Sequence, residues 1–164
     1  LKALEEQAEN IKSSLSQNRE LRKGFGENVM KVKEKTDFMR ILGQEMDGAK
    51  TKIVAFSNVG KEHSVIKDSI KGAADRNVEI QMMGKANAEA VKLAKEYGKS
   101  SVELRSYDHR LHAYIIDHKK VILGLTDFEQ EKPEYHFTIW EDNPTMASAL
   151  QTYFDTCWSK AEKL

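Results

Sequence analysis

The sequence predicts an α/β fold: a mixed, mostly parallel sheet with helices on both faces, preceded by a long N-terminal helix. Three observations support this class. Apolar residues recur at steps of three and four in the opening stretch, which is typical of a helix. Between residues 50 and 106, short apolar runs alternate with helical segments, which favours right-handed parallel βαβ units. Two apolar runs around residue 119 flank a tight turn and predict a β-hairpin.

Composition narrows the class of protein. The 164 residues carry 26 basic and 26 acidic side chains, so the charge balance gives no overall attraction to nucleic acid or to an anionic membrane. The single cysteine, Cys157, excludes a disulfide framework. No apolar run is long enough to span a membrane. We therefore expect a cytoplasmic protein without membrane contact.

Residues 1–23 are predicted to form a separate helix that mediates dimerisation. Its apolar seam consists of Leu4, Ala8, Ile11, Leu15 and Asn18, and the rest of the segment is almost wholly polar. This helix could pack on its own domain or pair with the same helix of a second chain, and we favour the homodimer. The chain begins at Leu1, inside the helical pattern and without an initiator Met, so we expect it to be part of a longer polypeptide.

The segment from residue 24 to residue 49 is predicted to contain a linker, a strand and a helix. Gly24 and Gly26 supply the backbone freedom of a linker or tight turn. The run 29–32 predicts a short edge strand. Thr36 or Asp37 is a suitable cap for the following helix. The apolar face of that helix comprises Phe38, Ile41, Leu42 and Ala49.

The alternating region is predicted to supply three strands and two helices. The strands are expected at 52–56, 78–83 and 102–106, and the helices from about 63 to 76 and from 86 to 97. Gly98 then ends the second helix.

The last third of the chain predicts a hairpin of strands 111–117 and 121–126, a further strand at 135–140 and a final helix. Asn143 and Pro144 are a suitable cap and first-turn pair for that helix. Its expected buried stripe comprises Met146, Leu150, Tyr153, Phe154, Cys157 and Trp158.

Polar side chains gather where the predicted strands end, which is the usual ligand region of an open α/β sheet. They include Ser57 and Asn58 after the first of these strands and the segment from Ser106 to His112 before the hairpin. A metal site is disfavoured, because His109 and His112 would point to opposite faces of a strand and Arg110 would repel a cation. We expect neither a metal nor another cofactor.

The segment RLHAYIIDHKKVILGLTD resembles the signature of phospholipase D-like domains, His-x-Lys-x4-Asp followed by Gly-Ser-x-Asn. Aligned on the aspartate, Asp117 takes the motif Asp and Gly124 the following Gly. His112 then stands where the Lys belongs, and Arg110 stands where the nucleophilic His belongs. Leu125 and Asp127 replace the Ser and the Asn.

The whole chain is also similar to the region that follows the winged helix in archaeal TrmB-type transcriptional regulators. The resemblance rests on the opening helix, the stretch VMKVKEKTDFMRILGQEMDGAKTKIVAFS, the hairpin and the final ALQTYFDTCW helix. It implies a dimerising helix at 1–23 and a phospholipase D-like effector domain at 24–164. DNA would then be bound only through an N-terminal winged helix, which is absent from this sequence.

A guanidinium stays protonated and cannot attack phosphorus, so Arg110 predicts a catalytically inactive domain that senses a small-molecule effector. The candidate ligand-binding residues are Ser57, Asn58, Ser106, Arg110, His112 and Asp117. Three alternatives stay open at this point. The chain could be a phosphodiesterase or nuclease whose site is assembled across a dimer, or a dimerisation domain without a ligand. Arg110 and Asp117 could also lie apart and serve structure only.

Overall fold

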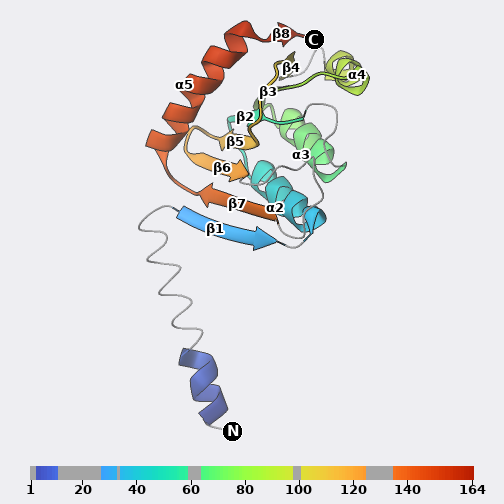
Figure 1. Cartoon of the computed structure of the whole chain (residues 1–164). Helices are drawn as coiled ribbons and strands as arrows, with labels where there is room; N and C mark the ends of the chain where they lie inside the picture. Colours follow the sequence, from blue (N-terminus) through green and yellow to red (C-terminus); the bar gives the residue numbers. More distant parts are fainter. Residues whose placement is uncertain (1–2, 11–26, 33, 59–63, 98–100, 125–134) are drawn as a thin grey trace.

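The computed structural model describes residues 3–10, 27–32, 34–58, 64–97, 101–124 and 135–164 (Figure 1). The strands are β1 (Glu27–Val32), β2 (Lys52–Phe56), β3 (Glu79–Gly84), β4 (Val102–Ser106), β5 (Ala113–Ile116), β6 (Lys120–Gly124), β7 (Tyr135–Trp140) and β8 (Glu162–Lys163). They form one sheet in the order β1-β7-β6-β5-β2-β3-β4-β8. Strand β8 is an addition that the sequence pattern did not predict.

The sheet is mixed, as predicted, but parallel pairs are fewer than expected. Only β2 with β3 and β3 with β4 run parallel among the described pairings. The βαβ rhythm ends at Ser106, and β5, β6 and β7 follow one another through reversals of the chain, so they pair antiparallel. Strand β1 is an edge strand, as predicted, and pairs with β7.

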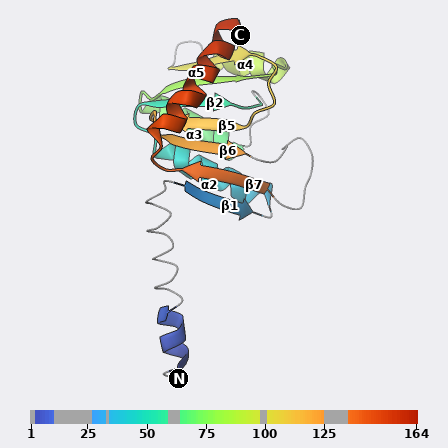
Figure 2. The same ribbon diagram turned by 60° about the vertical axis from the view of Figure 1, so that its left-hand side comes forward.

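Helices cover both faces of the sheet, as predicted. They are α2 (Lys35–Asp47), α3 (Ser64–Asp75), α4 (Ala88–Tyr97) and α5 (Pro144–Lys160). Helices α2, α3 and α4 pack on one face, whereas α5 lies across the other (Figure 2). None of the described helices is long and apolar enough to cross a membrane.

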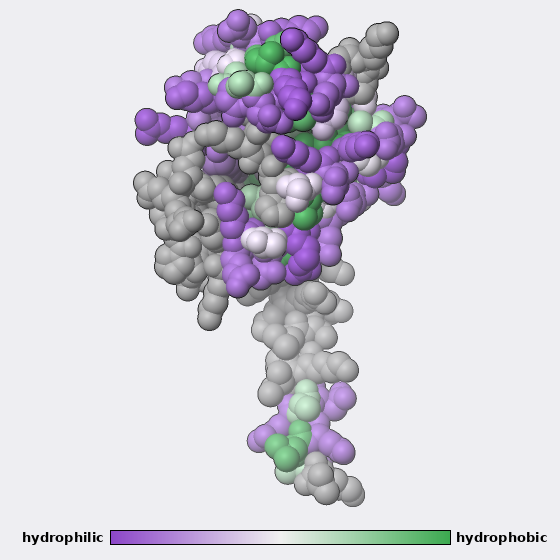
Figure 3. Space-filling model, turned by 90° about the vertical axis from the view of Figure 1, so that its right-hand side faces the viewer, coloured by the Kyte–Doolittle hydropathy of each residue, from purple (hydrophilic) through white to green (hydrophobic). Residues whose placement is uncertain are grey.

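Side-chain alternation along the strands builds a core on each face. Ala55 on β2 and Tyr114 on β5 belong to the core beneath α2, α3 and α4. Their neighbours Phe56 and Ala113 belong to the core beneath α5. The face that carries α3 and α4 is predominantly hydrophilic on its outside (Figure 3).

Helix α5 begins where the sequence predicts, but its buried side is narrower than expected. Asn143 caps it, since its side-chain oxygen accepts a hydrogen bond from the backbone N–H of Met146 at 3.0 Å. Phe154 and Cys157 are buried, as predicted, together with Ala147. Met146 and Tyr153 are instead 41% and 49% exposed, because only one narrow side of α5 contacts the sheet.

The N-terminal segment is helical over residues 3–10, and every residue of this stretch is exposed. Leu4, a predicted seam residue, is 69% exposed, and Ala8 is exposed as well. The other predicted seam residues, Ile11, Leu15 and Asn18, lie outside the described residues. Dimerisation through residues 1–23 and the division of the chain at residue 24 therefore stay predictions.

Close packing of α2 on α3 depends on Gly43. A Cβ at this position would stand 2.9 Å from Cγ1 of Val65 and 3.1 Å from Oγ of Ser69. The Val65 side chain is stiff at χ1 and cannot easily move away. The Ser69 hydroxyl donates a hydrogen bond to the carbonyl oxygen of Gly43 at 3.2 Å, which ties the two helices together.

We expect Gly43→Ala to lower the free energy of unfolding by about 1–2 kcal/mol, because overpacking outweighs the better helix propensity of alanine. Gly72→Ala on α3 is the matched control, since its Cβ would meet only Nη1 of Arg76 at 3.6 Å. That variant should gain about 0.5–1 kcal/mol from reduced backbone freedom in the unfolded chain. Urea unfolding of both variants measures the difference, and equal effects would contradict the role given to Gly43.

Candidate functional site

The candidate site lies at one edge of the sheet, which we call the carboxyl edge. The carboxyl ends of β2, β3 and β4 meet here, because these strands run parallel. Strand β5 runs antiparallel to β2, so its first residue, Ala113, lies opposite Phe56, the last residue of β2. The edge therefore gathers residues that follow β2, β3 and β4 and residues that precede β5.

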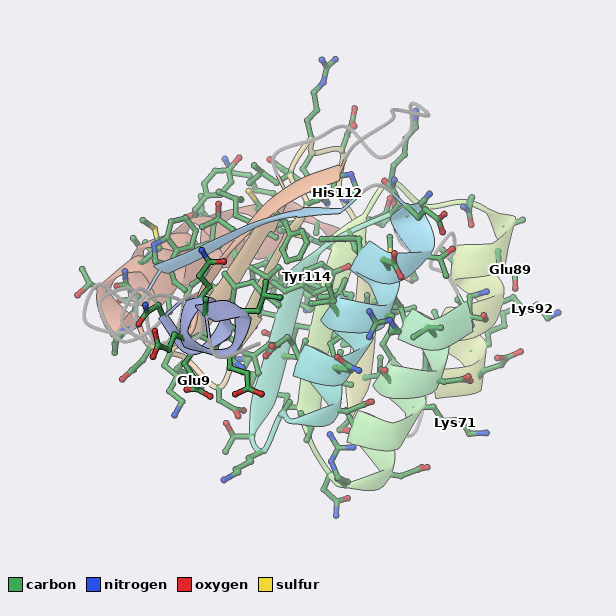
Figure 4. All side chains as sticks on the ribbon, turned by 90° about the horizontal axis from the view of Figure 1, so that it is seen from below. Glu9, Lys71, Glu89, Lys92, His112 and Tyr114 are labelled. Carbon is green, nitrogen blue, oxygen red and sulfur yellow. The ribbon has the colours of Figure 1, made fainter. Side chains whose placement is uncertain are left out.

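Ser57 and His112 come together at this edge. The pairing of β5 with β2 ends at Phe56 opposite Ala113, so the next residues, Ser57 and His112, leave the two strands at the same edge. The carbonyl oxygen of His112 accepts a hydrogen bond from the N–H of Gly124 at 2.7 Å, so His112 also stays in line with β6. Figure 4 shows His112 at the edge of the sheet and Tyr114 further in. By alternation, Ser57 and His112 share the face covered by α2, α3 and α4.

The Ser57 hydroxyl is buried and has no hydrogen-bond partner among the described residues. The residue is 2% exposed, and its Oγ has no hydrogen-bond partner within the described part of the chain. Its backbone N–H is satisfied, since it donates to the carbonyl oxygen of Met83 at 3.1 Å. A buried hydroxyl without a partner costs about 1–3 kcal/mol, which a ligand that hydrogen-bonds Oγ would recover.

The segment 107–112 is not a strand, in contrast to the prediction that β5 begins before residue 112. Nε2 of His109 lies 2.7 Å from the carbonyl oxygen of Met83, and Nδ1 accepts a hydrogen bond from the N–H of Leu111 at 3.1 Å. The imidazole therefore carries its proton on Nε2 and donates it to Met83. Its ring also meets Phe56 edge to face, with centroids 5.2 Å apart. His109 fastens this segment to β3.

Two more predicted residues flank Ser57 and His112, and a third lies away. Asn58 follows Ser57 directly and is half-buried, and Arg110 precedes His112 by two residues and is exposed. Ser106 ends β4, three strand spacings or roughly 14 Å from β5. Its Oγ accepts a hydrogen bond from the N–H of Ala86 at 3.4 Å, which holds the connection from β3 to α4.

Asp117 does not belong to the carboxyl edge, which corrects its assignment as a ligand-binding residue of that cluster. It follows β5 at the opposite edge of the sheet, five residues or roughly 17 Å along the strand from His112. Its carboxylate accepts hydrogen bonds from the backbone N–H groups of Lys50, Thr51 and Lys52 at 3.0, 2.8 and 3.1 Å and from the Thr51 hydroxyl at 3.0 Å. Arg110 and Asp117 lie apart, as one of the open alternatives held.

The same carboxylate stabilises a turn with unusual backbone angles. Asp117 and His118, the first two of the three residues between β5 and β6, have φ of 53° and 60°, the left-handed values of hairpin turns whose twist matches that of the strands. Aspartate tolerates this conformation better than most residues. Burial by itself raises the pKa of Asp117, but the bonds from Thr51, Lys50 and Lys52 outweigh it and hold the pKa below its ordinary value.

A second polar cluster lies at this opposite edge, and the sequence pattern did not predict it. The ammonium group of Lys120 binds the carboxylate of Glu45 on α2 and that of Glu141, which lies 3.1 Å away. Burial lowers the pKa of Lys120, but the two carboxylates outweigh burial and raise it. These residues stand 75 and 21 positions apart in the sequence, so only the fold reveals that α2, β6 and the residue after β7 are joined.

Cys157 on α5 interacts with two tyrosines, Tyr107 and Tyr153. Hydrogen bonding to Cys157 is the main cause that raises the pKa of Tyr107 and of Tyr153. The thiol itself is buried, so it packs in the core and is not presented to solvent, as the sequence indicates. Among the described residues no group of three His, Cys, Asp or Glu side chains could hold a metal ion.

Comparison with known proteins identifies the fold. No protein-family model matches the chain, and no curated protein sequence matches it significantly. The structure is similar to that of TrmBL2, described as an archaeal chromatin protein with a novel mode of DNA binding, with a TM-score of 0.67 and 22% identity. The match covers 99% of this chain and 66% of TrmBL2, so the chain corresponds to part of that protein.

Two phospholipase D-type structures are similar over most of the chain. The first is Nuc of Salmonella typhimurium, a phospholipase D family member, with a TM-score of 0.64 and 17% identity over 84% of this chain and 98% of Nuc. The second is NucT of Helicobacter pylori, with a TM-score of 0.67 and 14% identity over 84% of this chain and 98% of NucT. At these identities the similarity shows the fold alone, which is the mixed α/β fold of phospholipase D-like domains.

We expect Asp117→Asn to lower the free energy of unfolding at neutral pH by about 1–2 kcal/mol, because the amide keeps one acceptor oxygen but turns an N–H toward Lys50. Since the folded pKa of Asp117 lies below its ordinary value of 3.8, this advantage of the wild type is complete above pH 3.8. It disappears as the pH falls through the folded pKa.

Urea unfolding of both proteins from neutral pH to below pH 3.8 measures this difference. His118→Asn, at the next turn position, is the control, because asparagine tolerates a positive φ and no carboxylate is lost. A stability difference between wild type and Asp117→Asn that stays constant through the acid range would contradict the assigned role of the carboxylate.

Proposed function

We propose that this chain is the effector-sensing and dimerisation part of a TrmB-like transcriptional regulator of archaeal type, and that it does not catalyse phosphodiester hydrolysis. The observation that carries the proposal is Arg110. It occupies the position of the nucleophilic histidine in the phospholipase D motif and lies exposed on the segment 107–112 of a phospholipase D-like fold. The fold similarity to TrmBL2 over 99% of the chain supports the regulatory part of the proposal.

The imidazoles near Arg110 do not replace the missing nucleophile. Phosphoryl transfer of this type needs a histidine with a free ring nitrogen that can attack phosphorus. Both ring nitrogens of His109 are occupied by the backbone groups of Met83 and Leu111. His112 takes the position of the motif lysine, beside the permanently cationic Arg110, and we assign it to ligand binding.

The residues at the carboxyl edge match a small ligand with an anionic group and a hydroxyl group, such as a phosphorylated sugar. Arg110 offers a planar pair of donors to phosphate or carboxylate. Oγ of Ser57, which is buried without a partner within the described residues, would hydrogen-bond a ligand hydroxyl. His112 and Asn58 are the neighbouring polar residues at this edge.

Regulation would pass from this site to DNA through other parts of the polypeptide. In this proposal the helix over residues 1–23 joins two copies in the cytoplasm, and a winged helix before it contacts DNA. The exposed apolar Leu4 in the described part of this helix supports pairing with a second chain.

A phosphodiesterase with a site assembled across a dimer is the second candidate. It is favoured by the fold similarity to Nuc and NucT, which extends over 98% of each of those chains. In this case His112 of each copy would meet at a shared site.

We expect a ligand of the first candidate to raise the melting temperature of the full chain in a thermal-shift screen of sugars, sugar phosphates and nucleotides. The gain should approach about 2.7 kcal/mol at a hundredfold excess over Kd. Arg110→Ala should weaken binding at least about tenfold, because a charge-assisted hydrogen-bond pair is lost. Arg40→Ala, which removes an exposed guanidinium on α2, should leave binding unchanged. A flat screen, or binding retained in Arg110→Ala, would refute ligand sensing at this edge.

For the second candidate, the full chain is assayed with bis(p-nitrophenyl) phosphate. We expect no turnover above that of the buffer, because Arg110 cannot act as a nucleophile. The variants Arg110→Ala and His112→Ala control for a contaminating enzyme. Turnover that either substitution abolishes would overturn the inactive assignment and favour the phosphodiesterase.

A further inference from the structure

The first eleven residues of helix α5 present an uncharged outer side. Residues 144–154 (PTMASALQTYF) contain no Asp, Glu, Lys or Arg, although charged residues make up 32% of the chain. The opposite face of the molecule differs, since Lys71 on α3 and Glu89 and Lys92 on α4 project from it (Figure 4). Charged residues are typically depleted at the centre of protein interfaces.

The same side of α5 carries exposed apolar side chains. Met146 and Tyr153 are two of the four large apolar residues that are exposed in the described structure. The Tyr153 ring stacks on Phe56, with centroids 5.7 Å apart, so its position is held by the core. Half-exposed Leu150 lies between them along the helix. Rigid, partly exposed aromatic residues are frequent anchors of interfaces.

Two threonine hydroxyls on α5 are already satisfied by the helix itself. Thr152 donates to the carbonyl oxygen of Ser148 at 3.0 Å, and Thr156 donates to that of Thr152 at 3.0 Å. Such internal bonds leave the threonine methyl groups as the outward surface. Covering Thr152 and Thr156 would therefore leave neither hydroxyl unsatisfied, and an unsatisfied hydroxyl is a usual cost of burying a helix face.

We propose that the outer side of α5 docks against α5 of a second copy of this chain, with the two helices antiparallel about a two-fold axis near Ala149. In a two-fold interface each patch meets itself, so a charged patch would repel its copy, whereas this patch is uncharged. The small side chain of Ala149 allows close approach of the helix axes at the centre. Met146 of one copy would then lie beside Thr152 of the other.

The second copy is favoured over another partner by the proposed dimer, on which this inference rests. If residues 1–23 join two chains, the effective concentration of one domain around the other reaches about the millimolar range. Each α5 then encounters α5 of the linked chain at a higher concentration than other proteins. Even a weak interface between the two helices would therefore be occupied. Helix α5 is also the one described helix on its face of the sheet, so a second copy would complete that layer.

Cysteine crosslinking tests the proposed geometry directly in the full chain. Ala149→Cys places a thiol at the two-fold axis, and a short bis-maleimide should link the two copies into a covalent dimer. Val91→Cys on α4 is the control, because Val91 is exposed to the same extent as Met146, at 41%, but lies on the opposite face. Native Cys157 is buried and serves as the background. Absence of the Ala149 crosslink, or an equal yield from Val91→Cys, would overturn the inference.

A charge substitution provides an independent measurement. Met146→Lys should raise the dimer dissociation constant about tenfold or more in analytical ultracentrifugation, since it buries a charge in the interface. Val91→Lys should leave the constant unchanged. Equal melting temperatures of the two variants confirm that both are folded. Equal dissociation constants of Met146→Lys and the wild type would refute docking through α5.

Failure of this inference and failure of the proposed function give different results. The triple variant Leu4→Asp, Ile11→Asp, Leu15→Asp tests the N-terminal helix separately by light scattering. If this variant is monomeric, the wild type is dimeric and Ala149→Cys does not crosslink, the α5 interface is refuted and the N-terminal dimer stands. If Ala149→Cys crosslinks and the ligand screen is flat, the α5 interface stands and effector sensing is refuted.

Discussion

The register of β5 against β2 is the constraint on which the arrangement of this protein depends. The Asp117 carboxylate holds the turn after β5 to the three backbone N–H groups that open β2. A slip of one residue would send every β5 side chain to the other face and place polar groups in a core. With the register held, His112 and Ser57 follow the last β5–β2 pair at the far edge of the sheet. Asp117 therefore helps to position Ser57 and His112, although it lies at the opposite edge of the sheet.

The fold separates structural polar groups from those available to a ligand. At the edge of Asp117, the carboxylates of Asp117, Glu45 and Glu141 are bound to backbone N–H groups or to Lys120. At the carboxyl edge, Arg110 is exposed and the Ser57 hydroxyl is buried without a partner in the described structure. The polar groups at the edge of Asp117 stabilise the sheet. Arg110 and the Ser57 hydroxyl at the carboxyl edge are the groups on which the proposed ligand site is based.

The two sides of the sheet also differ in how they are covered. Three helices shield one side and bear charged outer surfaces, whereas α5 covers the other and is uncharged over residues 144–154. Phe56 on the α5 side of the sheet contacts both His109, which holds the segment 107–112, and Tyr153 on α5.

The sequence by itself determined the local elements. The strands at 52–56, 102–106 and 135–140 and the cap of α5 at Asn143 were predicted at their observed positions, because apolar periodicity and capping are properties of neighbouring residues. Features that depend on contacts between residues distant in the sequence were decided only by the tertiary structure. It moved Asp117 away from Arg110, gave His109 a structural role, reduced the share of parallel pairs and left Met146 and Tyr153 exposed. Each of these depends on which strands and faces meet, and residue spacing along the chain does not encode that.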